Sequence, residues 1–206
     1  MKGSLVIAAA LVIAAAAPSR AAKNTKTDTA TLGQSVPDFT LTDSTGKKHT
    51  LSESKDKVVV LEWLNYGCPF VKKQYNSKNM QKLQKEYGDK GVVWYSIISS
   101  KKGKQGNYPP DEINKMNQER DGHAAAILLD YDGVAGRMFD AKTTPDMFVI
   151  DHGVLKYSGA IDDKPSTDLE DVPTAHNFVR DALDSVLAGK PVKTAYIKSY
   201  GCGVKY

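Results

Sequence analysis

Hydrophobic and polar residues alternate in two short stretches that precede the apolar run at residues 57–64. Residues 39–42 and 47–51 both alternate, and the run Asp-Ser-Thr-Gly at residues 43–46 between them favours a turn. This pattern predicts a β-hairpin. Residues 57–64 then form a β-branched and apolar run, which is typical of a strand with both faces buried.

A helix is predicted directly after this strand, over residues 69–87. Proline suits the first helical position, because its missing N–H would have no partner there. The apolar stripe of this helix contains a five-residue step between Tyr75 and Met80, which breaks the usual spacing of three or four. We therefore expect a kink or a restart near Asn76, with Ser77 as a cap.

Strands and helices alternate through the rest of the chain. Strands are predicted at residues 92–98, 124–129, 147–150 and 154–160, and helices at residues 112–120, 134–139 and 174–188. This order predicts an α/β domain over residues 36–206, with a mixed central sheet covered by helices on both faces. Residues 22–35 are rich in Thr, Lys and Asn and are expected to form a flexible lead-in.

The first 21 residues have the pattern of a secretory signal. Lys2 precedes an apolar run of 13 residues at positions 5–17, and small residues stand at positions 19 and 21. The run is shorter than the roughly 20 residues that span a membrane as a helix. We expect cleavage after Ala21 and export to the periplasm or the extracellular space, with no stable membrane insertion afterwards. The alternative is an uncleaved N-terminal anchor.

Composition and charge narrow the function further. The chain has 206 residues, 41% hydrophobic and 25% charged, as in ordinary globular proteins. Its formal charge is +4, or +2 without Lys2 and Arg20, so nucleic acid is not expected as a partner. The chain's two cysteines are too few for a disulfide scaffold, and export would place them in an oxidising compartment. A single redox pair fits this composition better.

Cys68 is the strongest candidate for chemistry. It follows the buried strand and directly precedes the helix that Pro69 opens, so its thiol is expected at a helix N-terminus, which favours the thiolate. The alternative is a buried structural cysteine. Cys202 is flanked by Gly201 and Gly203 in the tail at residues 192–206. It either resolves Cys68 from a mobile tail or forms a permanent disulfide with it. A third state, in which both thiols stay free, is less expected after export.

Five segments resemble a known family. They are residues 62–71 (EWLNYGCPFV), 103–106 (GKQG), 143–151 (TTPDMFVID), 157–163 (YSGAIDD) and 201–205 (GCGVK). The chain resembles peroxiredoxin-like thioredoxin-fold proteins of the redoxin, or alkyl hydroperoxide reductase and thiol-specific antioxidant, group. The resemblance implies a thioredoxin-like α/β/α fold of three layers with a mixed central sheet, an N-terminal β-hairpin and a C-terminal tail.

The resemblance also implies roles for individual residues. Thr144 and Pro145 match the cis-proline element that faces the active cysteine, and together with Trp63 they are expected to bind substrate. Glu62 matches the buried acid that relays a proton to or from the thiol. The alternatives are an ordinary proline at the start of a strand and a strand-end carboxylate paired with a lysine or the backbone.

The chain departs from both main patterns of the group. Val71 stands where a Cys-x-x-Cys site has its second cysteine, so Cys68 has no local disulfide partner. Asn65 stands where a peroxiredoxin has Thr or Ser, and Leu61 where it has Pro. The amide of Asn65 has N–H donors that can reach a peroxide, although it cannot switch between donor and acceptor as a hydroxyl does.

Two hypotheses follow. The first is an exported thiol-dependent oxidoreductase in which Cys68 attacks a disulfide or a peroxide and Cys202 resolves. Its partners are a protein thiol or disulfide substrate or reductant, or a small peroxide. The second is a non-catalytic binding module with a structural Cys68–Cys202 disulfide. A copper-carrying relative ranks last, because paired cysteines with a nearby histidine are missing.

Metal and cofactor sites are not expected. The histidines have no ligand spacing and are scattered over positions 49, 123, 152 and 176. Arg137 precedes the Thr-Pro element and either lowers the pKa of the thiol or is a solvated helix residue.

Overall fold

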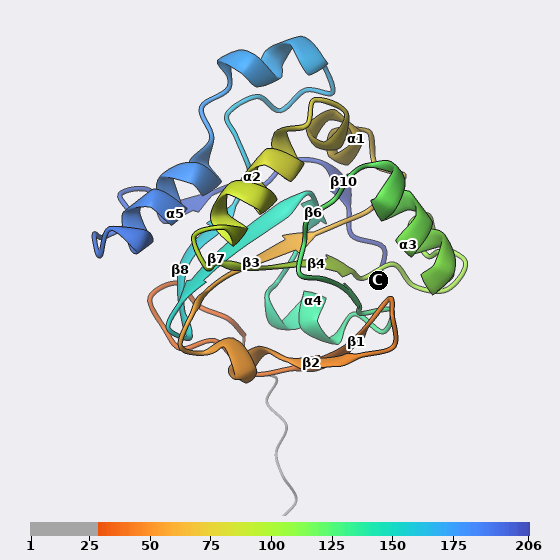
Figure 1. The fold of residues 1–206 in the computed structure, drawn as a ribbon, viewed down its shortest axis with the longest axis horizontal. Coiled ribbons are helices and arrows are strands. Elements are labelled where there is room, and N and C mark those ends of the chain that lie inside the picture. Colours follow the sequence, from red (N-terminus) through yellow and green to blue (C-terminus); the bar gives the residue numbers. More distant parts are fainter. Residues whose placement is uncertain (1–28) are drawn as a thin grey trace, which may run out of the picture.

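The computed structural model describes residues 29–206, which form a central sheet with helices on both faces (Figure 1). Residues 1–28, with the predicted signal and most of the predicted lead-in, lie outside the described residues. The strands are β1 (Thr40–Asp43), β2 (Lys48–Thr50), β3 (Val58–Trp63), β4 (Val93–Ile98), β5 (Ala126–Leu129), β6 (Thr143–Thr144), β7 (Asp146–Asp151), β8 (Val154–Gly159), β9 (Tyr196–Ile197) and β10 (Cys202–Gly203). The helices are α1 (Pro69–Asn76), α2 (Asn79–Gly88), α3 (Pro110–Glu119), α4 (Val134–Met138) and α5 (Phe178–Leu187), with 3₁₀ turns at Leu51–Ser54 and Leu169–Thr174.

The main sheet is mixed, as predicted. Within the described residues its strand order is β2-β1-β5-β4-β3-β7-β8-β9. β3 pairs in parallel with β4 and antiparallel with β7, and every residue of β3 is buried. The continuous apolar run of the sequence is therefore the central strand, as its composition indicates.

Two cores form because the side chains of a strand alternate between the faces of the sheet. Val58 and Val60 of β3 pack on one face with residues of α1, α2 and α5. Val59, Leu61 and Trp63 pack on the other face with residues of α4 and the N-terminal hairpin. Figure 1 shows α2 and α5 on one side of the sheet and α4 on the other.

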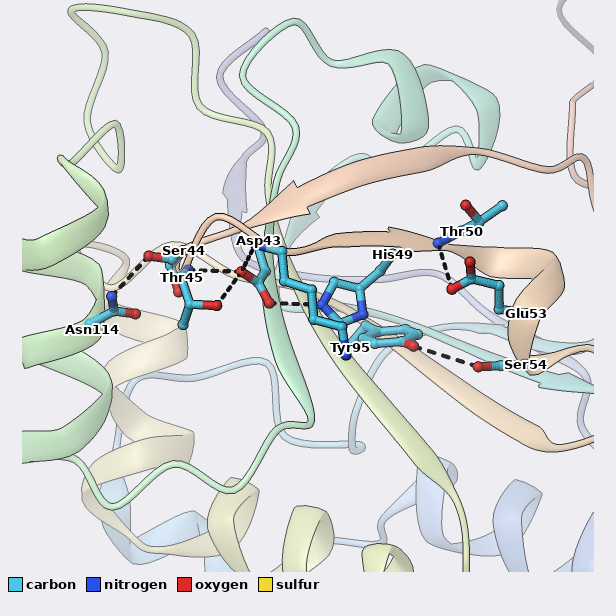
Figure 2. Close-up of polar contacts among 10 residues, drawn as sticks. Asp43, Ser44, Thr45, His49, Thr50, Glu53, Ser54, Tyr95 and Asn114 are labelled. Atoms are coloured by element: carbon cyan, nitrogen blue, oxygen red, sulfur yellow. Dashed lines mark hydrogen bonds and ion pairs between the residues drawn. The ribbon is translucent and has the colours of Figure 1, made fainter.

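The N-terminal hairpin carries a polar cluster of its own (Figure 2). Asp43 accepts hydrogen bonds from the amide and hydroxyl of Thr45 and lies 2.7 Å from His49 Nε2. Partial burial raises the pKa of Asp43, but these hydrogen bonds outweigh it and lower the pKa to about 2. The His49 ring packs edge-on against Tyr95 of β4. The cluster fixes the turn and attaches the hairpin to the sheet.

The break in the first long helix was predicted, but its cap was not. α1 ends at Asn76 and α2 begins at Asn79, as the five-residue step in the apolar stripe indicated. Ser77 is the C-terminal cap of α1, and Lys78 caps the start of α2 with φ = 61°. Ser77 therefore caps the helix that ends, whereas the restarted helix is capped by Lys78 in a left-handed conformation that the sequence analysis did not predict.

Two predicted helix starts also shift. α3 begins at Pro110 rather than residue 112, because proline again occupies the first helical turn. α5 begins at Phe178 rather than residue 174, with Asn177 as its N-terminal cap. The preceding Leu169–Thr174 segment is a separate 3₁₀ turn that contains Pro173.

Both ends of the described chain are held against the domain by backbone hydrogen bonds. The Ala30 amide donates to the Met138 carbonyl and the Gly33 amide to the Leu155 carbonyl, both at 2.8 Å. These residues belong to the fold rather than to a flexible lead-in that ends at residue 35. The tail adds β9 to the sheet edge and pairs β10 with β6, so in this structure it is docked rather than extended away from the domain. Within residues 29–206, no helix has the length and apolar character that crossing a membrane requires.

Candidate active site

Cys68 lies where β3 has ended and α1 begins. It is the N-terminal cap of α1, with Pro69 at the first helical position, as the sequence predicts. Its side chain is fully buried. The backbone N–H groups of Val71 and Cys202 are directed at its sulfur. A thiolate at this position is therefore stabilised by the helix start and by a second segment of the chain.

The Thr144–Pro145 element faces Cys68. The peptide bond between Thr144 and Pro145 is cis, which confirms the prediction from the resemblance. The Cys68 thiol donates a hydrogen bond to the Thr144 carbonyl, with 3.0 Å between sulfur and oxygen. The cis-proline turn and the cysteine thus form one site, although 76 positions separate Thr144 from Cys68 in the sequence.

Cys202 completes this site. β10 runs antiparallel to β6, so that Cys202 pairs with Thr144 and Gly203 with Thr143. The side chains of Cys202 and Cys68 are in hydrogen-bond contact, and the two thiols are free rather than bonded to each other. The structure therefore brings together the two cysteines that the sequence places far apart.

The two thiols have opposite pKa shifts. Burial raises the pKa of Cys68, but hydrogen bonds from the side chains of Cys202 and Thr144 and from two backbone amides outweigh it, so the pKa is lowered. The Thr144 carbonyl acts in the other direction, since it accepts from the protonated thiol. Burial and the neighbouring Cys68 raise the pKa of Cys202 to about 11. Cys68 therefore loses its proton first, and Cys202 keeps its proton and donates it to the Cys68 sulfur.

Glu62 is fully buried within β3, as predicted. It accepts four hydrogen bonds of 2.9–3.1 Å, which come from Tyr75 Oη, Gln84 Nε2, Trp94 Nε1 and Ser96 Oγ. Burial raises the pKa of Glu62, and the four donors offset part of that rise. Within the part of the chain that the structure describes, no hydrogen bond joins Glu62 to Cys68. Its role as a proton relay stays a prediction.

Asn65 shapes the loop that carries the cysteine. Its Oδ1 accepts from the Gly67 amide at 2.9 Å, and its Nδ2 donates to the Gln105 carbonyl at 3.3 Å. Its backbone carbonyl accepts from the Cys68 amide at 2.9 Å. The amide group is thus engaged in holding the loop between β3 and α1, and its donation to a peroxide stays a prediction.

Trp63 is not accessible at the surface, contrary to what its expected role in substrate binding requires. It is fully buried and packs against the rings of Phe139 and Phe148, which also contact each other. Its Nε1 donates to Ser99 Oγ at 2.9 Å. Because neighbouring residues of a strand face opposite sides of the sheet, Trp63 lies in the core on the face away from Glu62.

Arg137 does not act on the Cys68 thiol. Its guanidinium donates to the carbonyl of Gly133 at 3.0 Å and lies 4.9 Å from the centre of the Tyr206 ring. The groups with the largest effects on the pKa of Cys68 do not include it. The second interpretation, a helix residue at the surface, is the one that the structure supports. Among residues 29–206, no cluster of three His, Cys, Asp or Glu side chains could hold a metal ion.

The sequence analysis missed the residues that fix the tail against the site. Tyr200 packs edge-on against Phe70, two residues after Cys68, and donates a hydrogen bond to the buried Asp162. Gly201 has φ = 141°, and a Cβ built on it would lie 2.1 Å from the Thr144 carbonyl oxygen. The glycine beside Cys202 was a visible signal, but we interpreted it as mobility, whereas it permits the close approach of two backbones.

Comparison with known proteins agrees with this geometry. The Redoxin family model matches residues 31–177, which include Cys68, Thr144 and Pro145 and end before α5 and Cys202. A curated relative, the thioredoxin-like protein YneN of Bacillus subtilis, is 36% identical over 126 residues, which are 60% of this chain and 68% of YneN.

Solved structures cover more of the chain. A hypothetical protein, SMc02350 from Sinorhizobium meliloti, has a TM-score of 0.72 at 26% identity and covers 87% of this chain and 96% of its own. An uncharacterized conserved protein from Geobacillus kaustophilus has a TM-score of 0.71 at 28% identity, with coverages of 85% and 92%. Together with the mixed sheet, these matches confirm the predicted thioredoxin-like α/β fold.

Proposed function

The chain belongs to the Redoxin family, and on that premise we propose that it is a thiol–disulfide oxidoreductase in which Cys68 attacks and Cys202 resolves. One observation carries the proposal: two free thiols lie in contact beside a cis-proline turn, with the pKa of Cys68 lowered and that of Cys202 raised. In such a pair one cysteine is deprotonated and able to attack, while the other stays protonated until the second step.

The reaction has two steps. The Cys68 thiolate attacks one sulfur of a substrate disulfide, so a mixed disulfide forms and the other substrate sulfur leaves as a thiolate. Cys202 then gives up its proton and attacks the Cys68 sulfur. The Cys68–Cys202 disulfide forms, and the second substrate sulfur leaves. Two electrons pass from the cysteine pair to the substrate, and an external thiol reductant must return them.

A disulfide is the better-supported substrate. Asn65 replaces the hydroxyl residue of a peroxiredoxin site, and its amide is bound within the loop. With a peroxide, Cys68 would become a sulfenic acid, and condensation with Cys202 would release water and form the same disulfide. A peroxide is the second candidate because the resolving chemistry is identical. Protein thiols or disulfides in general are the expected partners.

The competing function is a binding module in which Cys68–Cys202 is a permanent staple. The buried position of Cys68 favours it, because a buried disulfide resists reduction. The reduction potential of the pair distinguishes the two functions: a value below about −300 mV is typical of a structural disulfide, and redox-active pairs lie higher.

Turnover by cysteine variants tests the proposal. The purified protein, given dithiothreitol, is expected to reduce a protein disulfide catalytically, and Cys68→Ser to reduce none above the uncatalysed rate. Cys202→Ser is expected to accumulate a mixed disulfide on Cys68 because the second step is missing. Full activity of Cys68→Ser would refute the proposal, and turnover with peroxide but not with disulfide would select the second candidate.

We also propose export, on the basis of the charged start, apolar run and small residues in residues 1–21. The test is the mature N-terminus of the protein expressed in a bacterium. A start near residue 22 in the extracytoplasmic fraction is expected, and an uncut chain in the cytoplasm would contradict it.

A further inference from the structure

The last seven residues of the chain, 200–206, form a segment that we call the C-terminal strap. It crosses the site with its Cys202–Gly203 stretch paired to β6. The Val204 amide donates to the Lys142 carbonyl at 3.0 Å, and the Lys101 amide donates to the Lys205 carbonyl at 2.8 Å. The strap is therefore attached along its length to elements on both sides of the thiol pair.

Tyr206 anchors the end of this strap in a slot on α4. A Cβ built on Gly133 would lie 2.4 Å from the Tyr206 ring, and one built on Gly136 would lie 2.4 Å from Tyr206 Oη. Tyr206 Oη donates to the Ala141 carbonyl at 2.9 Å, and the Arg137 guanidinium lies over the ring. The aromatic ring thus fills space that two glycines leave open.

Gly136 is the informative member of this slot. Gly133 has φ = 67° and caps α4, so its backbone alone explains a glycine there. Gly136 lies inside α4 with φ in the ordinary negative range, where alanine would favour the helix. The contact that a methyl group would obstruct is the one with Tyr206. The fit of the ring accounts for this residue.

The strap also covers the edge of β6, to which an extended segment of another protein would have to bind in order to reach Cys68. The backbone of Thr144 lies beside the Cys68 thiol. The edge of β6 at Thr144 is occupied by Cys202 of the same chain, which pairs with it. An extended segment of another protein could bind here by adding a strand, but only if β10 leaves. Cys202 and an outside cysteine therefore compete for the same edge and for the same sulfur.

We propose that Tyr206, seated between Gly133 and Gly136, determines whether Cys68 reacts with its own Cys202 or with an extended cysteine-containing segment of a partner protein. The inference rests on the proposed roles of the two thiols. Among residues 29–206, no hydrogen bond joins Tyr206 to either thiol, and we assign it the role of a positioning residue. When its ring is seated, Cys202 stays on β6 and closes the disulfide; when it is released, the edge of β6 is open to the partner.

The two outcomes differ in which thiols are oxidised: the Cys68–Cys202 pair in the first, and the outside thiol in the second. After Cys68 forms a mixed disulfide with a partner, attack by Cys202 expels the partner thiolate and closes Cys68–Cys202. If the strap has left, the mixed disulfide persists until an outside thiol attacks, which frees the Cys68 thiolate and forms a disulfide between the outside thiol and the partner. Tyr206 thus sets the balance between these two attacks.

The test measures two quantities that should move in opposite directions. The first is the rate at which oxidised glutathione closes Cys68–Cys202. The second is the affinity for a fluorescent peptide that copies residues 198–206 with serine in place of Cys202, which binds without thiol chemistry. In Tyr206→Ala we expect disulfide closure to slow about tenfold and peptide affinity to rise about tenfold, a change worth about 1.4 kcal/mol in each equilibrium or barrier.

Matched variants separate positioning from general damage. Gly136→Ala should slow closure in the same way, because its methyl group displaces the ring, but should not gain peptide affinity, because the slot is filled. Tyr206→Phe keeps the ring and should restore closure. Tyr196→Ala removes an exposed tyrosine of β9 that lies outside the strap and should change neither quantity.

Several results would overturn the inference. Closure and peptide binding that both stay unchanged in Tyr206→Ala would do so, as would a fall in both together, which indicates loosening of the whole fold. Thermal melting of each variant identifies the latter. If oxidised glutathione closes no disulfide in the unmodified protein, the proposed function fails. The affinity for the fluorescent peptide then still decides whether Tyr206 holds the strap.

Discussion

Cys202 and Thr144 lie directly opposite each other in an antiparallel pair, and the Thr144 carbonyl accepts a hydrogen bond from the Cys68 thiol. This relationship joins three segments that are far apart in the sequence into one site. It places the second cysteine beside the cis-proline turn. The chain has Val71 at the position where a Cys-x-x-Cys site has its second cysteine, so Cys202 is the thiol that lies close to Cys68 instead. The second thiol of the site is supplied by a strand rather than by the helix.

The first prediction concerns the acidity of Cys68. Burial raises the pKa of this thiol, and the Cys202 side chain is the foremost of the hydrogen-bond donors that lower it. Cys202→Ala removes that donor, so the pKa of Cys68 should rise and its alkylation by iodoacetamide should shift to higher pH. Cys202→Ser keeps a donor and should shift less. An unchanged pH profile in Cys202→Ala would show that the Thr144 side chain and the backbone amides hold the thiolate without it.

The second prediction concerns the fit of Gly201. A Cβ at this position would lie 2.1 Å from the Thr144 carbonyl oxygen. Gly201→Ala should therefore lift β10 from β6 and slow closure of the Cys68–Cys202 disulfide by about tenfold or more, since 1.4 kcal/mol suffices for a factor of ten. Quenched-flow oxidation followed by mass spectrometry measures the rate.

Gly203 supplies the matched control for this change. A Cβ at Gly203 would meet only the Lys142 carbonyl at 4.0 Å, an ordinary contact. Gly203→Ala should close its disulfide at nearly the unmodified rate. Equal slowing in both variants would mean that backbone flexibility, rather than the approach to Thr144, governs closure.

The third prediction concerns the pH dependence of stability through Asp146, which follows the cis-proline. Burial raises its pKa from 3.8 to about 6, although backbone amides and Ser199 oppose the rise. A raised carboxyl pKa means that the folded state binds the proton more tightly, so Asp146 favours folding at low pH and this contribution is lost as pH rises from about 4 to 6.

Asp146→Asn removes this titration. Its free energy of unfolding relative to the unmodified protein should therefore increase between pH 4 and pH 7, by up to about 3 kcal/mol for a shift of about two pKa units. Urea unfolding at the two pH values measures the change, which is independent of any constant cost of the substitution. A difference that stays constant or decreases with pH would contradict the assigned environment.

The fourth prediction separates Trp63 from substrate binding. Trp63→Phe keeps most of the ring volume but removes the N–H donor to Ser99, so stability should fall by about 1–3 kcal/mol because a buried polar group loses its partner. The KM for a protein disulfide should stay unchanged, since Trp63 is fully buried on the other face of the sheet. A raised KM with unchanged stability would restore the role that the sequence suggested.

The sequence was most informative where local physics decides the structure. Residues 57–64 could be identified as a buried strand, and Pro69 as the start of a helix with Cys68 at its cap. The break between Tyr75 and Met80 followed from helical spacing alone. The cis-proline was available only through resemblance, because most bonds to proline are trans.

The sequence could not show contacts that depend on the tertiary structure. The slot for Tyr206 consists of two glycines on α4 that have no periodic signature, and the pairing of β10 with β6 is only two residues long. Trp63 was misassigned because one position along a strand changes the face on which a side chain lies. Gly201 was visible, but its reason is the Thr144 carbonyl that lies against it.

Disulfide mapping during turnover tests the central claim most directly. The reduced protein is mixed with a substrate disulfide, quenched by alkylation and digested at successive times. We predict that a peptide linked through Cys68 and Cys202 forms as the substrate is reduced and is lost when dithiothreitol is added. A Cys68–Cys202 bond that is already present before substrate and persists at constant amount through every cycle would contradict the account.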